Sequence, residues 1–233
     1  SSGYSQQDWR FLISTMIDLS DDAALDEEIT GYLAAQFPPP DNRAATAVDG
    51  PLTVRFEEWK VPTLGQRSRD PVEAPDGSIW WVGQWLDILG RLDPATGEME
   101  EFALPPGARP HSVNIGPDGT IWYTGNRNAT MGRMDPETGE ITEYPMPDEA
   151  ARDPHTAEFD ADGILWFSLQ HSNMIGRLDP ETGEVRLAES PRASARPYGL
   201  KIAEDGTVWV SCNGANCLLR IDPGTMEVTE IPL

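Results

Sequence analysis

The stretch from Pro154 to Glu184 reads PHTAEFDADGILWFSLQHSNMIGRLDPETGE, and it decides the fold because its features recur along the chain. An Asp-Gly pair is followed by a Trp, then by an Arg eleven residues after the Trp, and then by an Asp-Pro turn. The period is 42 to 44 residues, as shown by the positions of the repeated Trp at 80, 122, 166 and 209. Four features that keep one spacing through four copies exclude a chance similarity.

Each copy predicts four short strands. The Asp-Gly pair closes the first hairpin, the Trp lies in the second strand, the third ends near the Arg, and a Pro-x-Thr-Gly-Glu turn leads into the fourth. Four strands at this period are typical of a β-propeller blade, so the fold class is all-β. We expect full blades over about 68–106, 107–149, 150–192 and 193–233.

A partial blade is expected before these four. Thr53 to Pro62 (TVRFEEWKVP) matches a fourth strand, so residues 51–233 are assigned to the propeller. Because an open array leaves unpaired faces at its ends, we expect this chain to be a piece of a longer protein whose further blades close the ring.

A helical segment is expected over residues 1–40, with a linker over 41–50. Trp9, Leu12, Ile13, Met16 and Ile17 fall on one face of a first helix. Residues 20–22 offer an N-cap for a second helix, whose apolar residues are at 29, 32, 33 and 37.

This segment resembles the C-terminal helices of a c-type cytochrome domain, on the pattern GYSxxxW…MI…YLAxxFP. Met16 matches an axial-ligand position, and the alternative is a core methionine. The haem-attachment motif C-x-x-C-H is absent from this sequence, so no haem can be attached to it as written.

The charge balance limits the partners. With 39 acidic and 17 basic residues the net charge is −22, which argues against nucleic acid and anionic membranes and favours a ligand that is neutral, cationic or bound through a metal. No run of eighteen apolar residues or signal peptide is present. Cys212 and Cys217 either form a bridge or are two small packing residues.

Departures from the repeat indicate where a ligand binds. The residue after the blade-opening proline is Val72, His111, His155 or Tyr198. We expect His111 and His155 to project from neighbouring blades into one small-molecule pocket at the mouth of the central channel. The alternative is a structural imidazole bonded to a neighbouring blade. Amides four residues after each Trp (Gln84, Asn126, Gln170 and Asn213) form either a second ring at this mouth or ordinary loops.

The repeat resembles the streptogramin (virginiamycin B) lyase family. The motif PHxxxxxxDGxxWF, followed by N-x-I-G-R-[LI]-D-P-x-T-G-E, is clearest from His155 to Pro180. The resemblance implies a seven-bladed propeller that opens cyclic depsipeptide antibiotics by elimination, using a histidine and a Mg²⁺ ion held by two glutamates.

The resemblance also implies site residues. His155 matches the catalytic histidine and His111 the substrate-binding histidine, and we add Tyr198 and Asn126 as candidate substrate-binding residues. Asp153 and Gln170 match the two metal-binding glutamates. Asp153 has a shorter reach than glutamate and Gln170 is neutral, so we expect weakened Mg²⁺ binding.

Three hypotheses follow, and the first two rank close together. The first is a carbon–oxygen lyase that acts on a cyclic depsipeptide or related ester, as in antibiotic resistance. The second is a non-catalytic propeller that binds a ligand or partner beside a periplasmic electron-transfer module. A lactonase or quinone-dependent dehydrogenase ranks last, because its acidic metal cluster or quinone contacts are missing. A periplasmic or secreted location is expected, and the oligomeric state is left open.

Overall fold

A computed structural model describes residues 4–14, 19, 22–38, 47–48 and 54–233 of the chain. The chain divides into two compact units, Ser1–Gln66 and Arg67–Leu233. The described residues of the first unit form two helices and a small strand pair, and sixteen strands in four sheets form the second unit. Within the described ranges no helix is long and apolar enough to cross a membrane.

The helices of the first unit are α1 (Gln6–Ser14) and α2 (Ala23–Gln36). Asp22 caps α2, as the sequence predicts, because its Oδ1 accepts a hydrogen bond from the backbone N–H of Leu25 at 3.0 Å. The guanidinium of Arg10 on α1 pairs with two carboxylates of α2, those of Asp26 at 2.5 Å and Glu27 at 2.6 Å.

The apolar faces of the two helices differ from the prediction in one respect. Leu12 and Ile13 of α1 are buried, as predicted. On α2 the expected apolar side is only partly covered, since Ile29 and Leu33 are half-buried while Tyr32 is 63% exposed and Phe37, which follows the helix, is 47% exposed. Met16, which matched an axial-ligand position, lies outside the described residues.

The strand predicted from Thr53 to Pro62 is much shorter in the structure. Only Val54–Arg55 form a strand, β2, and it pairs with β1 (Ala47–Val48), inside the segment expected to be a linker. A fourth strand of a blade is held by the third strand of the same blade. Among the described residues before Val54 no such strand exists, so 56–61 remain without regular structure.

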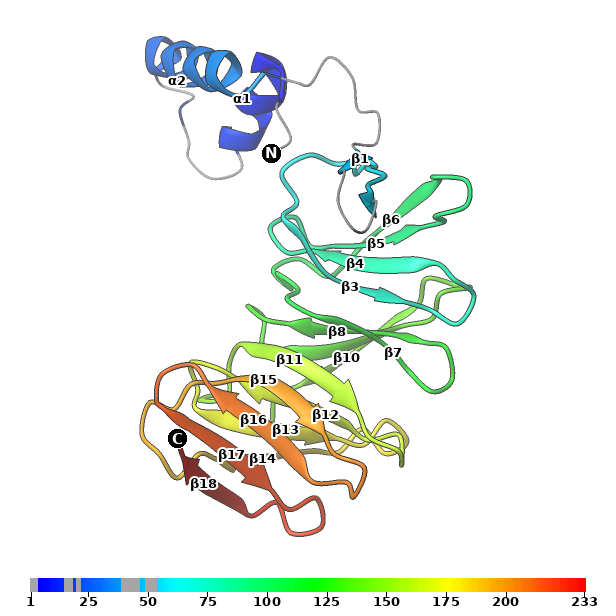
Figure 1. The fold of residues 1–233 in the computed structure, drawn as a ribbon, viewed down its shortest axis with the longest axis vertical. Helices are drawn as coiled ribbons and strands as arrows, with labels where there is room; N and C mark the ends of the chain where they lie inside the picture. The colour runs from blue at the N-terminus through cyan, green and yellow to red at the C-terminus, as the bar shows by residue number, and fades with distance from the viewer. Residues whose placement is uncertain (1–3, 15–18, 20–21, 39–46, 49–53) are drawn as a thin grey trace. The chain divides into compact units, whose positions relative to one another are not determined.

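In the second unit each blade is a four-stranded antiparallel sheet whose strands follow one another in the chain (Figure 1). The first two blades comprise β3 (Ser68–Glu73), β4 (Ile79–Gly83), β5 (Ile88–Leu92), β6 (Met99–Ala103), β7 (Val113–Ile115), β8 (Ile121–Gly125), β9 (Thr130–Met134) and β10 (Ile141–Pro145). The last two comprise β11 (Pro154–Phe159), β12 (Leu165–Leu169), β13 (Met174–Leu178), β14 (Val185–Glu189), β15 (Pro197–Ile202), β16 (Val208–Cys212), β17 (Cys217–Ile221) and β18 (Val228–Pro232). The predicted all-β propeller architecture is therefore confirmed.

The Asp-Gly turns close the first hairpin of each blade. Gly119 has φ of +83°, a conformation that glycine adopts without steric cost, and Asp118 Oδ1 accepts hydrogen bonds from the backbone N–H and the hydroxyl of Thr120. In the third blade Asp160 takes this role, accepting from the N–H groups of Asp162 and Ile164. These carboxylates therefore cap turns.

The core lies between consecutive blades. Trp80, Trp122 and Trp166 are almost completely buried, and each of three apolar clusters joins residues of two neighbouring blades. The first strands of neighbouring blades also contact each other, in the pairs β3 with β7, β7 with β11, and β11 with β15. Residues at the start of the first strands are thereby brought together around one axis.

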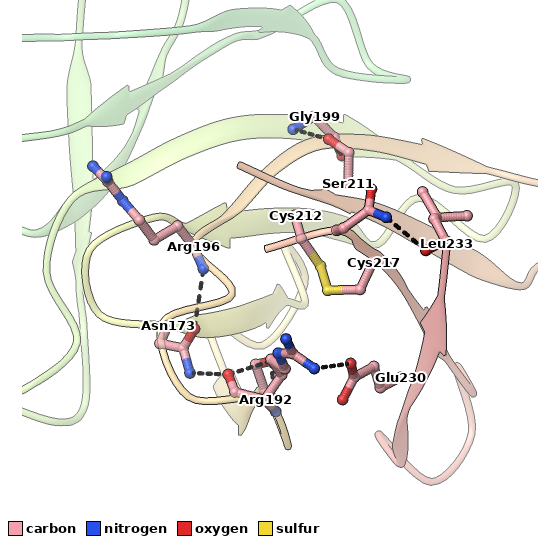
Figure 2. Close-up of a disulfide and its surroundings, with 11 residues drawn as sticks. Asn173, Arg192, Arg196, Gly199, Ser211, Cys212, Cys217, Glu230 and Leu233 are labelled. Carbon is pink, nitrogen blue, oxygen red and sulfur yellow. Dashed lines mark hydrogen bonds and ion pairs between the residues drawn. A yellow bond between two sulfur atoms is a disulfide. The ribbon is translucent and has the colours of Figure 1, made fainter. Parts of the chain in front are cut away.

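A disulfide links the two middle strands of the last blade. Cys212 at the end of β16 and Cys217 at the start of β17 are bonded, with their Cα atoms 5.4 Å apart (Figure 2). Of the two alternatives that the sequence leaves open, the bridge is the one found. Figure 2 also shows Asn173 of the third blade, which bonds to the carbonyl of Arg192 and the N–H of Arg196 and so joins the last two blades.

Candidate functional site

Three aromatic side chains from consecutive blades form a tilted stack at the starts of the first strands, with interplanar angles of 37° and 44° between successive rings. The ring centroids of His111 and His155 are 3.4 Å apart, and those of His155 and Tyr198 are 4.4 Å apart. Both histidines are 5% exposed, whereas Tyr198 is 37% exposed. The structure thus brings together the two histidines and the tyrosine that the sequence singles out.

Strand irregularities turn these side chains toward one another. The pairing of β11 with β12 shifts between Pro154 and Ala157, and that of β15 with β16 shifts between Pro197 and Leu200. Such bulges leave residues out of the ladder and re-aim their side chains. His155 and Tyr198 lie within these two bulges.

Hydrogen bonds between blades hold the backbone of the stack. Thr124 Oγ1 donates to the carbonyl of His155 at 3.2 Å, and Ser168 Oγ donates to the carbonyl of Tyr198 at 2.7 Å. The side-chain amide of Asn126 donates to the carbonyl of Pro154 at 3.1 Å. Asn126, a candidate substrate-binding residue, therefore also anchors the start of β11.

The residue of the first blade that is equivalent to these three was not predicted from the sequence. Each of His111, His155 and Tyr198 lies seven residues before an Asp-Gly turn, and in the first blade that position is Arg69. Strand pairing agrees, since Val72 opposes Trp80 as Glu158 opposes Trp166. Alignment on Pro71 selects Val72 instead, which is wrong by three residues. Counting back from the Asp-Gly turn would have found Arg69.

Arg69 and His111 share the carboxylate of Asp70. Asp70 Oδ2 is 3.4 Å from His111 Nδ1 and Oδ1 is 3.5 Å from Arg69 Nε. Both nitrogens are buried and make no hydrogen bond in the part of the chain that the structure describes. Burial raises the pKa of Asp70, but its contacts with His111 and Arg69 outweigh this effect and the pKa lies below its ordinary value.

The electrostatics keep His155 neutral. Burial, and then the neighbouring His111 and Arg69, lower the pKa of His155 to about 3. His155 Nδ1 is 3.1 Å from Thr156 Oγ1. If Nδ1 carries the proton and donates to Thr156, Nε2 holds a free lone pair and is able to accept a proton.

The two expected metal-binding residues are arranged differently from a cation site. Both oxygens of Asp153 are occupied: Oδ2 accepts from the N–H of His171 at 2.8 Å and lies 2.7 Å from its Nδ1. Oδ1 accepts from the N–H and hydroxyl of Ser172 at 3.3 and 3.2 Å. Both oxygens of Asp153 are therefore engaged by His171 and Ser172, and an ion would compete with these contacts.

Gln170 is buried and supplies only a neutral amide. No group of three or more His, Cys, Asp or Glu side chains is placed to hold a metal within the described residues. Because Mg²⁺ requires free oxygen ligands in octahedral geometry, Asp153 and Gln170 as arranged do not fit it. Mg²⁺ therefore stays a prediction of the family resemblance.

Solved structures with this fold include lyases. The chain matches virginiamycin B lyase from Staphylococcus aureus with a TM-score of 0.71 and 26% identity, covering 81% of this chain and 62% of that one. A streptogramin B lyase matches with a TM-score of 0.70 and 31% identity, covering 78% and 58%. A catalytically inactive histidine-to-alanine variant of the S. aureus enzyme with quinupristin matches with a TM-score of 0.69 and 27% identity, covering 78% and 59%.

The chain therefore spans about three fifths of the length of these solved proteins. No curated protein matches it. The sequence profile of the Virginiamycin B lyase family matches residues 47–233, which include all four blades and the histidine stack. The chain belongs to the Virginiamycin B lyase family.

Proposed function

We propose that this chain is a carbon–oxygen lyase that acts on a cyclic depsipeptide or a related ester bound over His111, His155 and Tyr198. The observation that carries the proposal is the buried, neutral imidazole of His155, which is stacked between two rings and flanked by the charge of Arg69. A neutral imidazole is able to accept a proton without first losing one.

In this reaction His155 removes a proton from a carbon next to a carbonyl group. The electron pair left on that carbon forms a C=C bond, and the neighbouring C–O bond breaks with its electron pair leaving on oxygen. No water is added, so a ring opens without a change in mass. The guanidinium of Arg69 is the nearby cation that stabilises negative charge as it develops on the carbonyl oxygen.

The test is mass spectrometry with chromatography of a streptogramin B antibiotic incubated with the whole chain, in Mg²⁺ and separately in EDTA. A product of unchanged mass and altered retention is expected, and the rate should fall by about 100-fold or more in His155→Ala. Arg220→Gln, an exposed change in the last blade, is the control that should keep the rate. Product in EDTA would support the metal-free reaction, and product only in the presence of Mg²⁺ would show that the reaction needs the metal.

A second candidate is a propeller that binds a ligand without reaction. It is favoured by the occupied carboxylate of Asp153, the neutral Gln170 and the low pKa of His155, which lowers the driving force for proton transfer. Unaltered antibiotic in the presence of folded protein, together with ligand-induced shifts of the His111 and His155 signals in NMR spectra, would favour this candidate over the lyase.

We also propose a periplasmic or secreted location. It is supported by the Cys212–Cys217 disulfide, since such bonds persist in oxidising compartments and are rare in the cytosol. Thiol labelling of the protein taken from its native cells, with and without prior reduction, tests this proposal. Two labelled thiols without reduction would contradict it.

A further inference from the structure

A second register of the propeller carries arginines in an unfavourable backbone conformation. Residues nine before each Asp-Gly turn are Arg67, Arg109, Asp153 and Arg196. Their φ angles are 52°, 43°, 55° and 53°, all in the left-handed region. Gly, Asn and Asp are the residues that adopt this region most readily. Three arginines in equivalent strained positions indicate a role that their side chains supply, because such strain clusters at ligand sites.

Two of these arginines line one pocket. Its volume is about 430 Å³, within the range of small-molecule sites. It extends over the ends of the first three blades and is lined by Arg67, Gln84, Trp85, Arg109, Asn126, Arg127, Arg152 and Asp153. Four guanidinium groups and two neutral amides therefore face the only carboxylate among these lining residues.

The four arginines make no ion pair among the described residues. Two of the four repeat arginines at the other end of the blades differ, since Arg91 pairs with Asp76 and Arg133 with Asp118. The acid in the pocket, Asp153, is already engaged by His171 and Ser172. Apart from Arg152 Nε, the guanidinium groups of the pocket make no hydrogen bond among the described residues, so their donors are available to an external acceptor.

Two pocket arginines are held in place by other contacts. The guanidinium carbon of Arg67 lies 5.4 Å from the ring centroid of Trp85, a cation–π contact. Arg152 Nε donates to the carbonyl of Glu149 at 3.1 Å. Holding the side chains in advance reduces the entropy that a ligand must overcome on binding.

We propose that this pocket is a binding site for a small polyanion, whose carboxylate or phosphate oxygens accept hydrogen bonds from Arg67, Arg109, Arg127 and Arg152. Guanidinium groups bind both oxyanions in the same forked geometry. The net charge of −22 alone favours a neutral or cationic ligand, but local charge decides what a pocket attracts. The pocket shares Asn126 and Asp153 with the candidate residues around His155, but the proposed anion binding does not depend on the reaction proposed for His155.

Isothermal titration calorimetry of the whole chain with citrate, pyrophosphate and acetate tests the proposal. Citrate or pyrophosphate should bind, and acetate, which has one charge, should bind far more weakly. Binding of citrate alone would identify carboxylates as the ligand chemistry, and binding of pyrophosphate alone would identify phosphates. In Arg127→Gln, an exposed loop change, affinity should fall about tenfold, as expected when a charged hydrogen bond is lost.

Arg220→Gln is the matched control, since it removes the same charge from an exposed position in the last blade. It should leave the affinity within about twofold, well under the tenfold that one charged hydrogen bond represents. Equal weakening in both variants, or no heat from either polyanion up to about 1 mM, would overturn the proposal.

Arg109→Gly separates a ligand-binding role from a structural one. Glycine relieves the left-handed strain and keeps the backbone N–H that donates to Asp87. The unfolding temperature should stay the same or rise, while affinity for the polyanion falls. A drop in unfolding temperature with unchanged affinity would show that Arg109 serves the fold and would contradict the proposal.

Discussion

At the scale of single residues, the state of His155 follows from what surrounds it. Its ring is stacked on His111 and Tyr198, and a proton on it would add a buried positive charge close to Arg69. Desolvation and the neighbouring charges both favour the neutral imidazole. The native packing therefore requires the neutral form of His155, and lowering the pH should destabilise the folded state.

This coupling predicts a pH dependence of stability. The pKa of His155 is about 3 in the folded chain and about 6.5 in an unfolded one. Between these values the unfolded chain binds more protons than the folded chain, so the free energy of unfolding rises with pH. The contribution of His155 is lost progressively as the pH falls below about 6.5. The slope due to one such group is at most about 1.4 kcal/mol per pH unit.

Urea unfolding of the native chain and of His155→Gln at pH 7 and pH 5 measures this contribution. The variant carries a neutral side chain at both pH values, so its stability should change less over this interval. Arg220→Gln, measured in parallel, should keep the native slope. Identical pH dependence of the native chain and His155→Gln would show that His155 is protonated without cost to the fold.

The residues of the candidate site could be predicted only in part from the sequence. His111, His155 and Tyr198 were found because they depart from a repeat whose geometry is known. Arg69 was missed because Pro71 looks like a blade-opening proline, although the count to the Asp-Gly turn places the residue correctly. The engagement of Asp153 with His171 depends on the direction of a side chain on left-handed backbone, which no spacing encodes.

At the scale of the elements, each of the first three blades pairs an aromatic residue with a glycine across its two middle strands. The pairs are Trp81 with Gly90, Tyr123 with Gly132, and Phe167 with Gly176. A Cβ atom on any of these glycines would collide with the facing ring. In the last blade the same position pairs Val210 with Leu219. The last blade thus fills this position with two medium-sized side chains, one from each strand, where the other blades use one large ring and a glycine.

Exchanging the two kinds of pair tests this account. Gly176→Leu alone should cost about 1–3 kcal/mol or more in the free energy of unfolding, since it overpacks the contact with Phe167. The double change Phe167→Val with Gly176→Leu reproduces the pair of the last blade and should recover most of the loss. Chemical denaturation of the native chain, the single variants Gly176→Leu and Phe167→Val, and the double variant measures this coupling, and strictly additive effects would contradict it.

The disulfide adds a covalent restraint at the level of one hairpin. Cys212 and Cys217 are separated by five positions, and closing a loop of this length should stabilise the fold by about 2 kcal/mol through the unfolded chain. The double variant Cys212→Ser with Cys217→Ser should lose this amount in urea unfolding. Reductant should destabilise the native chain and leave the double variant unchanged, and an effect on both would locate the cause elsewhere.

The strands could be predicted from the sequence where they belong to complete hairpins. The Asp-Gly turns set the register of the first and second strands of each blade, and the Asp-Pro turns that of the third and fourth. The segment from Thr53 to Pro62 matches the sequence pattern of a fourth strand, but strand formation depends on a partner strand. A pattern read along one strand does not reveal whether that partner is present.

At the scale of the whole molecule, the net charge of −22 opposes the compact state. Surface ion pairs such as Arg91 with Asp76 contribute little against this repulsion. Salt screens the interaction between exposed charges that lie more than about 10 Å apart at 0.1 M, and this screening distance becomes shorter at higher salt concentrations. Because repulsion dominates over these pairs, added salt should stabilise the protein.

We therefore predict that raising NaCl from about 0.01 to 0.2 M at pH 7 increases the unfolding temperature by about 2–4 °C. The triple variant Glu137→Gln, Glu181→Gln, Glu204→Gln removes three exposed carboxylates that form no ion pair among the described residues. Its unfolding temperature should be higher at low salt, and its response to salt should be smaller. Differential scanning calorimetry measures both. A salt-induced decrease in the native chain would mean that its few ion pairs outweigh the net charge, and the acidic surface would then be a stabilising network.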